Sequence, residues 1–305
     1  MMEIEWKKLE LADRALVQSY FAYEQLGNCE ACFANNYLWE PFYELSYSVI
    51  DGFLVFLTSG SGRSVSFPLA KEAYGPDRLG KVLSKLETYF AEKERAFRMH
   101  LVTEKQYRRL EELFPGKYSI TFVRDIADYV YETEKMISLA GKKLHGKRNH
   151  INKFKENFPD WRYEPLSEEN VEACRQMAEE WRIANACDEK DEKHQEFCMT
   201  LRALELFRTL ELRGGVLWAG GRVVAFTLGE KLNDETFVVH IEKAFADVQG
   251  AYPMINQQFL IHEAAEFPYV NREEDAGSEG LRKAKLSYHP AFLVEKGVVT
   301  YNEGK

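Results

Sequence analysis

The chain contains no run of apolar residues that approaches the roughly 18 to 20 needed to cross a bilayer. Its longest candidate, Gly52–Leu57, has the length of a buried strand. The first ten residues carry several charges, so no secretory signal is expected there. These absences exclude an integral membrane class for this sequence and predict a cytoplasmic protein.

Cysteine is scarce. Five cysteines, an odd number, do not make a disulfide framework. Cys29 and Cys32 form a C-x-x-C pair, but no second C-x-x-C and no H-x-x-x-H supplies the other two ligands that zinc needs. We interpret the pair as ordinary thiols of a reducing compartment. Neither a metal nor a tightly bound cofactor is expected.

Positive charge is in deficit, with a formal net charge of −9 over 305 residues. The protein as a whole is therefore not a general binder of polyanions, and any site for nucleic acid or phosphate must be a local basic patch. Hydrophobic residues make up 45% and charged residues 29%, which is typical of a globular chain. The length suggests one large or two moderate domains.

The order of the expected elements repeats. A helix, several antiparallel strands, and then alternating helices and strands extend to about residue 131, and a similar series begins after about residue 160. Hairpins are expected at Asp51-Gly52 and Gly220-Gly221, and the aromatic segment Phe33–Trp39 is expected to be a strand. The repeat predicts an α/β protein of two similar halves, residues 1–140 and 141–305.

The most informative stretch is Thr236–Glu266. A β-branched and aromatic strand is followed by a turn with a single glycine and then by a helix. Free N–H groups and the helix dipole make the start of such a helix an anion site. Most units of this kind bind nothing, and that alternative stays open. The expected phosphate-binding residues are Gln249, Gly250, Ala251 and Tyr252.

The segment Gly141–Lys155 is basic and contains no acid. A solvated helix face usually mixes charges of both signs, so a one-signed cluster predicts a site for an RNA backbone, a nucleotide or a lipid head group. The alternative is a basic linker helix that pairs with acids elsewhere. Its cations are Lys142, Lys143, Lys147, Arg148, Lys153 and Lys155, with His145 and His150.

A second constellation lies within Asn271–Pro290, after a strand, where acids, bases and glycines alternate. Lys285 could bind a phosphate or stabilise an oxyanion, and Arg282 could bind a carboxylate or phosphate in bidentate fashion. Glu273, Glu274 or Asp275 could orient an incoming amine or hydroxyl. The alternative is a surface loop whose ion pairs contribute little.

His240 and Glu242 alternate with apolar neighbours on the Thr236 strand and therefore share one face of it. A polar pair close to an anion loop is a candidate acid/base pair. The alternative is a histidine satisfied within the core.

The segments Gly141–Phe154, Val248–Pro253 and Asn271–Pro290 resemble a group of uncharacterised bacterial proteins, and the strings K-R-N-H-I-N-K-F (residues 147–154) and E-G-L-R-K-A-K-L-S-Y (residues 279–288) are the most specific parts of the resemblance. That group is related to the catalytic C-terminal domain of phosphatidylglycerol lysyltransferase. The resemblance covers most of the chain. It implies two tandem acyltransferase folds of the GNAT type, each with a mixed central sheet flanked by helices, as in the Fem-type peptidyl transferases.

The related transferases move an amino acid from aminoacyl-tRNA to a lipid hydroxyl or a peptidoglycan amine. The resemblance implies that Gln249 and Gly250 occupy the phosphate loop and that Lys285, with Arg282 beside it, serves aminoacyl transfer. The chain departs from the family in having one glycine in the loop, which argues against coenzyme A. It also lacks the membrane-spanning half, which argues against a lipid acceptor.

Two functions follow from these observations. The first is an acyl- or aminoacyltransferase that uses aminoacyl-tRNA or acyl-CoA as co-substrate and a small molecule, peptide or lipid head group as acceptor. Lys147 and Arg148 would then hold the carrier. The second is a non-catalytic nucleotide- or RNA-binding protein that retains the fold. The catalytic candidates for the first are Lys285, Glu242, His240, Glu273 and Asp275.

Overall fold

The computed structural model describes residues 4–59, 63–185 and 192–302. The chain divides into two compact units. Unit 1 comprises Met1–Asp128, Glu274–Ser278 and Leu293–Lys305, and unit 2 comprises Tyr129–Glu273 and Glu279–Phe292. The division into residues 1–140 and 141–305 stays a prediction. The chain passes from unit 1 to unit 2 after Asp128, and the later segments Glu274–Ser278 and Leu293–Lys305 belong to unit 1 again.

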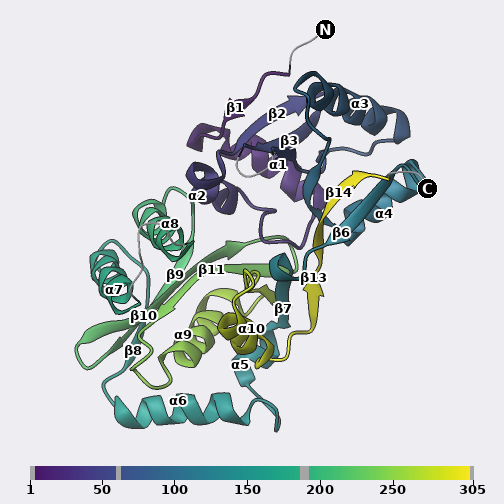
Figure 1. Ribbon diagram of the computed structural model, residues 1–305. Coiled ribbons are helices and arrows are strands. Elements are labelled where there is room, and N and C mark those ends of the chain that lie inside the picture. Colours follow the sequence, from purple (N-terminus) through teal and green to yellow (C-terminus); the bar gives the residue numbers. More distant parts are fainter. Residues whose placement is uncertain (1–3, 60–62, 186–191, 303–305) are drawn as a thin grey trace. The chain divides into compact units, whose positions relative to one another are not determined.

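Unit 1 contains a mixed sheet with helices packed around it (Figure 1). Its strands follow the order β1-β2-β3-β4-β5-β14-β6. Neighbouring strands are antiparallel except β4 and β5, which are parallel. The elements are β1 (Lys7–Lys8), η1 (Leu11–Asp13), α1 (Arg14–Glu24), α2 (Phe33–Tyr43), β2 (Ser46–Ile50), β3 (Phe53–Thr58), β4 (Ser64–Val65), α3 (Pro76–Glu92), β5 (Met99–Thr103), α4 (Glu104–Leu113), β6 (Tyr118–Phe122), η2 (Arg124–Ile126) and β14 (Lys296–Tyr301).

The hairpin predicted at Asp51-Gly52 is confirmed. Asp51 and Gly52 have φ values of 50° and 85°, which join β2 to β3 through a two-residue turn. Positive φ at both central residues matches the right-handed twist of the strands, and Asp-Gly tolerates it. The turn therefore fixes the register in which Ile50 pairs with Phe53.

The strand predicted over Phe33–Trp39 is wrong, because these residues belong to helix α2. Their aromatic rings pair at helical spacing. Phe33 stacks on Tyr37 with ring centroids 5.5 Å apart, and Trp39 lies 5.7 Å from Tyr43. Side chains four residues apart meet on a helix and not on a strand. This packing outweighs the β propensity of the aromatic residues.

Unit 2 contains the other mixed sheet, in the order β13-β7-β12-β11-β10-β9-β8 (Figure 1). Strands β11 and β12 are parallel, and β8 to β11 are successively antiparallel. The elements are β7 (Asp128–Glu132), α5 (Thr133–Ser138), α6 (His145–Asn157), β8 (Arg162–Pro165), α7 (Val171–Ala184), α8 (Glu192–Leu206), β9 (Arg213–Ala219), β10 (Arg222–Lys231), β11 (Thr236–Ala244), α9 (Ala251–Phe259), η3 (Leu260–Ala264), β12 (Tyr269–Asn271), α10 (Glu279–Leu286) and β13 (Phe292–Val294).

Strand β10 is buried from Val223 to Glu230, so both faces of the sheet are covered there. Helix α9 packs on β9, β10 and β11, and helix α7 packs on β10 and α8. The hairpin predicted at Gly220-Gly221 is confirmed, with φ values of 59° and 76°. These elements hold β11 at the centre of the unit, with its side chains aligned in two rows.

The helix predicted after the Thr236 strand is present, but its bounds differ. Gly250, with φ of 87°, is the N-cap residue of α9, and the helix continues beyond Phe259 as a π-helical turn, η3. The basic segment forms helix α6, which packs against α9. Throughout the described residues, we find no helix with the length and apolarity required to cross a membrane.

Candidate functional site

A buried ion pair lies on one face of β11 in unit 2. The Oε1 atom of Glu242 accepts a hydrogen bond from Nη2 of Arg272 at 2.8 Å, and its Oε2 atom accepts one from Nδ2 of Asn256 at 2.9 Å. Only 12% of the side chain of Glu242 and of Arg272 is exposed. Strand β11 supplies the acid, helix α9 the amide and the end of β12 the guanidinium. Both oxygens of the carboxylate are thus fixed.

Two tyrosines surround the guanidinium of Arg272. Its Cζ atom lies 5.1 Å from the ring centroid of Tyr288 and 5.9 Å from that of Tyr131. Burial raises the pKa of both phenols above the usual value. Burial opposes the positive charge of Arg272, but Glu242 and the two tyrosines raise its pKa above the ordinary value. The arginine is therefore charged and mostly shielded from solvent, with two aromatic rings beside it.

Lys147 of helix α6 completes this group. Its Nζ atom lies 3.9 Å from the ring centroid of Tyr288. Burial, followed by the nearby charge of Arg272, lowers the pKa of Lys147, while Glu242 raises it. We call Glu242, Arg272, Asn256, Tyr131, Tyr288 and Lys147 the Glu242 cluster. It places a carboxylate, an arginine and a partly buried lysine of lowered pKa together, and such groups can orient a reactant, stabilise developing negative charge and move a proton.

His240 lies two residues before Glu242 on the same strand, as the alternation predicted. Its Nδ1 atom lies 2.7 Å from Oε1 of Glu273, and its Nε2 atom lies 3.1 Å from Oε1 of Glu230. Each ring nitrogen therefore faces a carboxylate. The structure joins His240 to these two acids and not directly to Glu242, so the residues form two neighbouring groups along the strand.

Lys285 lies on α10 and is buried. Its Nζ atom donates to the main-chain carbonyl of Arg272 at 2.6 Å, and it lies 5.8 Å from the ring of Tyr129. The main-chain carbonyl of Lys285 in turn accepts a hydrogen bond from the hydroxyl of Tyr131 at 2.9 Å. Lys285 thus ties α10 to the segment that carries Arg272. Arg282 is partly buried on the same helix.

The acids of the second constellation belong to different units. Glu273 lies in unit 2, whereas Glu274 and Asp275 lie in unit 1. Asp275 is fully buried, lies 3.4 Å from Nη1 of Arg124, and accepts a hydrogen bond from the main-chain N–H of Gly277 at 3.0 Å. Within unit 1 these contacts fix the loop that carries Asp275.

The expected phosphate loop precedes α9. Gln249 is exposed, Ala251 is buried and Tyr252 is 37% exposed. The N–H of Ala251 donates to Val248, and a Cβ atom at Gly250 would lie 2.2 Å from the main-chain oxygen of His150. Helix α6 therefore covers Gly250 closely. Of the four expected residues, Gln249 and Tyr252 are the exposed ones.

Helix α6 uses its cations in different ways. The guanidinium of Arg148 donates to the carbonyls of Leu139 and Gly141 and so closes the preceding loop. Lys153 pairs with Glu156, and Lys155 lies over the ring of Trp161. Lys142 and Lys143 are exposed, and within the described residues no partner is found for either. The basic surface open to a polyanion is therefore narrower than the sequence suggests.

The C-x-x-C pair lies in unit 1 and contacts a buried lysine. The Nζ atom of Lys296 lies 2.7 Å from Asp128, 2.7 Å from Glu30 and 3.6 Å from the sulfur of Cys29. Burial first, and then Asp128 and Glu30, raise the pKa of Cys29 well above the usual value. The sulfur of Cys32 lies 3.2 Å from the main-chain oxygen of Cys29. An ammonium group occupies the centre of this acidic cluster.

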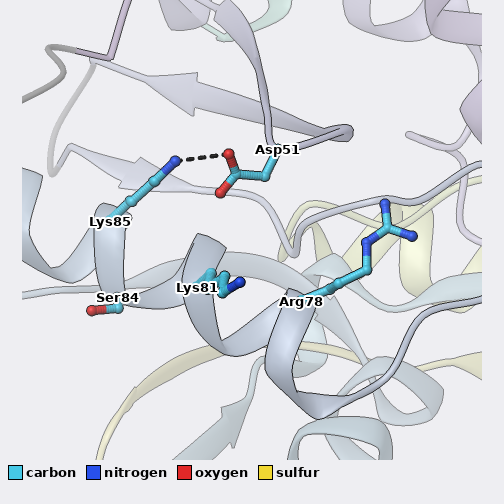
Figure 2. A pocket seen from close by; sticks show the side chains of 5 residues that line it. All are labelled: Asp51, Arg78, Lys81, Ser84 and Lys85. Carbon is cyan, nitrogen blue, oxygen red and sulfur yellow. Dashed lines mark hydrogen bonds and ion pairs between the residues drawn. The ribbon is translucent and has the colours of Figure 1, made fainter.

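Unit 1 also has an open basic pocket of about 460 Å³ between the β2–β3 turn and α3 (Figure 2). The Nζ atom of Lys85 lies 2.8 Å from Oδ1 of Asp51, and the guanidinium of Arg78 pairs with Glu72 at 2.8 Å. Exposed pairs of this kind contribute little to binding or stability. We therefore interpret this pocket as solvated surface and not as a binding site.

Sequence reasoning named Glu242 and Lys147 but missed Arg272, Asn256, Tyr131 and Tyr288. Arg272 and Tyr288 stand inside the strings that carried the family resemblance, at residues 271–290. The sequence carried a signal for both residues, because Arg272 directly follows strand β12 and Tyr288 lies in the turn after helix α10. Their meeting with Lys147 depends on the packing of α6, which the local pattern does not contain.

Residues 21–299 match the family described as phosphatidylglycerol lysyltransferase, C-terminal. A conserved protein of unknown function from Bacteroides thetaiotaomicron superposes with a TM-score of 0.91 and 37% identity, covering 98% of this chain and 100% of that chain. L-PGS from Bacillus licheniformis superposes with a TM-score of 0.67 and 15% identity, covering 100% of this chain and 95% of that chain.

The predicted fold class is confirmed. A tandem GNAT protein from the clavulanic acid biosynthesis pathway superposes with a TM-score of 0.51 and 10% identity, covering 99% of this chain and 100% of that chain. An uncharacterised protein of Mycoplasmoides gallisepticum is 25% identical over 189 residues, and the match spans 60% of this chain and 59% of that relative's length. Because the family match extends from residue 21 to residue 299, the chain belongs to the family of the C-terminal domain of phosphatidylglycerol lysyltransferase.

Proposed function

We propose that the chain is an aminoacyl- or acyltransferase whose reaction takes place at the Glu242 cluster of unit 2. The donor is a phosphate-bearing carrier, aminoacyl-tRNA or acyl-CoA, and the acceptor is an amine or a hydroxyl of a small molecule, peptide or lipid head group. The observation that carries the proposal is Lys147 over Tyr288, beside the buried pair of Arg272 and Glu242. Membership of the family supports transfer chemistry.

In the proposed step, the acceptor nitrogen or oxygen attacks the carbonyl carbon of the donor ester or thioester. The bond from that carbon to the carrier oxygen or sulfur then breaks. Lys147 acts in its neutral form, which its lowered pKa favours; its amine takes the proton from the acceptor, and the ammonium so formed returns it to the leaving group. Arg272 stabilises the oxyanion that develops on the carbonyl, since a cation in a desolvated site acts strongly on developing charge.

The other candidates act as positioning residues in this scheme. Lys285 holds the main chain of Arg272 through its 2.6 Å hydrogen bond. His240 and Glu273 fix the segment on the other side of Arg272, because Glu273 is the next residue and is bound to the imidazole at 2.7 Å. Glu242 keeps Arg272 charged and oriented. Loss of any of these would displace the guanidinium by a fraction of an ångström and slow transfer.

Lys142 and Lys143 support a nucleic-acid carrier. Both are exposed at the start of the basic segment. A tRNA acceptor stem places phosphates along an extended surface, and exposed lysines contact them with a strong dependence on salt. Arg148 is excluded from this role because its guanidinium is bound to two main-chain carbonyls. A charged tRNA as donor would place the protein in the cytoplasm.

The test is transfer by the purified full chain. The donors are total tRNA charged with radiolabelled amino acids and radiolabelled acetyl-CoA, offered with amines, short peptides and a bacterial lipid extract. Lys147→Met should reduce turnover about a hundredfold or more, while the fold stays intact. Lys231→Met removes a lysine that pairs with Asp234 on the exposed end of β10 and serves as the matched control. Equal turnover in the Lys147 variant would refute the mechanism.

The two donors separate by size and charge. Charge reversal of Lys142 and Lys143 to glutamate should weaken the use of charged tRNA strongly and spare acetyl-CoA. It should also reduce the slope of binding against salt concentration by about one phosphate contact per lysine. If the transfer rates with charged tRNA and with acetyl-CoA fall equally, the basic segment contributes to stability and does not bind the carrier.

The second candidate function is a non-catalytic binder of nucleotide or RNA. It is supported by the closure of Gly250 against His150 in α6, which leaves little room over the expected phosphate loop. In that case charged or uncharged tRNA should stabilise the protein on heating, with no transfer to any acceptor. Transfer above the uncatalysed rate would exclude this alternative.

A further inference from the structure

We propose that the chain forms a homodimer through β6, an edge strand of unit 1, with a second copy of the chain as the partner. β6 (Tyr118–Phe122) is the last strand of its sheet, and among the described residues it pairs with β14 alone. In the dimer, the β6 strands of two copies run antiparallel on either side of a two-fold axis at Thr121. This contact belongs to unit 1 and does not rest on the function proposed for the Glu242 cluster.

The main chain of β6 alternates between β14 and the open edge. The N–H of Val123, directly after β6, donates to the carbonyl of Lys296 at 3.0 Å. The antiparallel register continues through all of β6 without a shift, so every second residue bonds to β14 and the residues between them point away from it. The N–H and C=O groups of Ile120 and Phe122 therefore lie at the open edge, and the described residues supply no partner for them.

This edge lacks the features that keep edge strands from pairing with another chain. Charged side chains, prolines, bulges and very short strands give such protection. The sequence of β6, Y-S-I-T-F, contains no charge and no proline, and its pairing with β14 has no bulge. The other edge strands of the two sheets are protected: β1 consists of two lysines, β13 has three residues, and β8 carries Arg162, Glu164 and Pro165. β6 is thus open to a further strand.

A two-fold axis at Thr121 uses the open main-chain groups. In that register, Ile120 faces Phe122 of the partner subunit, and the two residues exchange both of their N–H···O bonds. The carbonyl of Tyr118 already accepts a hydrogen bond from the hydroxyl of Tyr107 at 3.2 Å, so this end of β6 is left outside the new pairing. Thr121 faces the partner's Thr121, and no charged side chain is brought opposite another.

The side chain of Phe122 gains a neighbour in this arrangement. It is 40% exposed, and the residue opposite it on β14 is Gly297, which has no side chain to cover the ring. In the dimer, the partner's Ile120 lies opposite Phe122 on the same face, and a pair of an aromatic and a β-branched residue stabilises antiparallel strands. A strand from another protein is selected by charges or side-chain pockets beside the edge. Because β6 has no charge and complements itself, a second copy is the partner that fits.

The first test is sedimentation of the full chain between about 1 μM and about 500 μM, since a small interface gives a weak dimer. The native protein should show an equilibrium of monomer and dimer. Thr121→Lys places two ammonium groups opposite each other and should weaken association about tenfold or more. Val49→Lys adds the same charge at an exposed position of the interior strand β2 and should associate like the native protein.

Two outcomes of this test would overturn the proposal. One is a native protein that remains monomeric throughout the range, which would leave the edge to solvent or to a strand of another protein. The other is a dimer that Thr121→Lys does not weaken, which would place the contact elsewhere on the chain. Thr121 is exposed, so the thermal unfolding of the monomer should be nearly the same in the lysine variant and the native protein.

A disulfide tests the register. A Cys187→Ser, Cys198→Ser background keeps only buried cysteines. In it, Thr121→Cys should give a cross-linked dimer on mild oxidation, because the Cα atoms of facing residues in a pair without hydrogen bonds lie about 4.5 Å apart, within reach of a disulfide. Ser119→Cys is the matched control. It lies on the same face of β6 but faces the partner's Val123, so two copies of it stay more than roughly 10 Å apart. Equal cross-linking of the two variants would overturn the proposal, and neither result depends on transfer activity.

Discussion

The carboxylate of Glu242 binds the guanidinium of Arg272 at 2.8 Å, and its second oxygen accepts a hydrogen bond from the side-chain amide of Asn256 at 2.9 Å. The side chains of this ion pair are 12% exposed. Glu242→Gln would leave the arginine charge buried without a counter-ion, so we expect a loss of about 3 to 5 kcal/mol in the free energy of unfolding. Urea denaturation measures it.

The burial of this ion pair can also be tested with a double variant. The double variant Glu242→Leu with Arg272→Met removes both charges, and it should be more stable than the sum of the single losses predicts. Asp234→Asn, which breaks the exposed pair with Lys231, should change stability by less than about 1 kcal/mol. If Glu242→Gln behaves like Asp234→Asn, the pair is not buried in solution.

Gly250 is a second point at which the packing of unit 2 can be tested. A Cβ atom there would lie 2.2 Å from the carbonyl oxygen of His150 and 2.9 Å from Cβ of Phe154, and its φ is +87°. Gly250→Ala should therefore destabilise the protein by about 2 kcal/mol or more, because α6 would have to shift. Thermal unfolding measures the change.

Gly146 is the matched control for Gly250. It lies in α6, and a Cβ atom there would meet nothing within 4 Å. Gly146→Ala should raise the free energy of unfolding by up to about 0.5 kcal/mol, and with it the melting temperature slightly, since alanine favours the helix. Equal effects of the two substitutions would show that α6 does not cover the start of α9.

Local features of the fold could be predicted from the sequence. The hairpins at Asp51-Gly52 and Gly220-Gly221 follow from two adjacent residues that tolerate positive φ, and helix α3 follows from apolar residues at helical spacing. Helix α2 is not predicted when the β propensity of its aromatic residues is given the most weight. The i, i+4 pairs Phe33–Tyr37 and Trp39–Tyr43 are the sequence signal that favours a helix there.

Only some residues of the candidate site could be predicted from the sequence, because the residues that form it are far apart in the chain. Glu242 stood out as a polar residue on a strand, and Lys147 as part of a basic run. Their relation through Arg272 and Tyr288 depends on α6, β11 and α10 meeting, and long-range packing leaves no local signature. The return of β14 to the sheet of unit 1 is non-local in the same way.

His100 predicts a dependence of stability on pH. It is partly buried on β5, with Nδ1 2.9 Å from the hydroxyl of Ser64, and burial lowers its pKa from 6.5 to about 4. Between these values the unfolded chain binds a proton that the native protein does not bind. Stability is therefore full above pH 6.5 and falls as the pH decreases toward 4, by about 1 to 3 kcal/mol in total.

His100→Asn removes the titrating group and can keep the hydrogen bond to Ser64. Its stability should change less between pH 4 and pH 6.5 than that of the native protein, as measured by urea unfolding at several pH values. His289→Asn, at an exposed position with φ of 55°, is the control and should keep the native profile. If the stability of the native protein and that of His100→Asn change equally with pH, the conclusion that His100 is neutral in the folded protein is wrong.

The cysteines predict a pattern of chemical reactivity. Cys29 lies 3.4 Å from Oδ1 of Asp128, and burial raises its pKa well above the usual value. Burial also raises the pKa of Cys174 to about 12. Cys32 is buried as well, whereas Cys198 is partly exposed. Thiolates and not thiols react with disulfide reagents, so Cys198 should react first.

The experiment uses a Cys187→Ser background, because Cys187 lies outside the described residues. A disulfide reagent should then modify one cysteine rapidly in the native protein and the others only on unfolding, with peptide mapping by mass spectrometry to identify the first as Cys198. Mild oxidation should not join Cys29 to Cys32, since a thiol held between Asp128 and Lys296 is neither exposed nor ionised. A Cys29–Cys32 disulfide formed in the native protein would instead assign the pair a redox role.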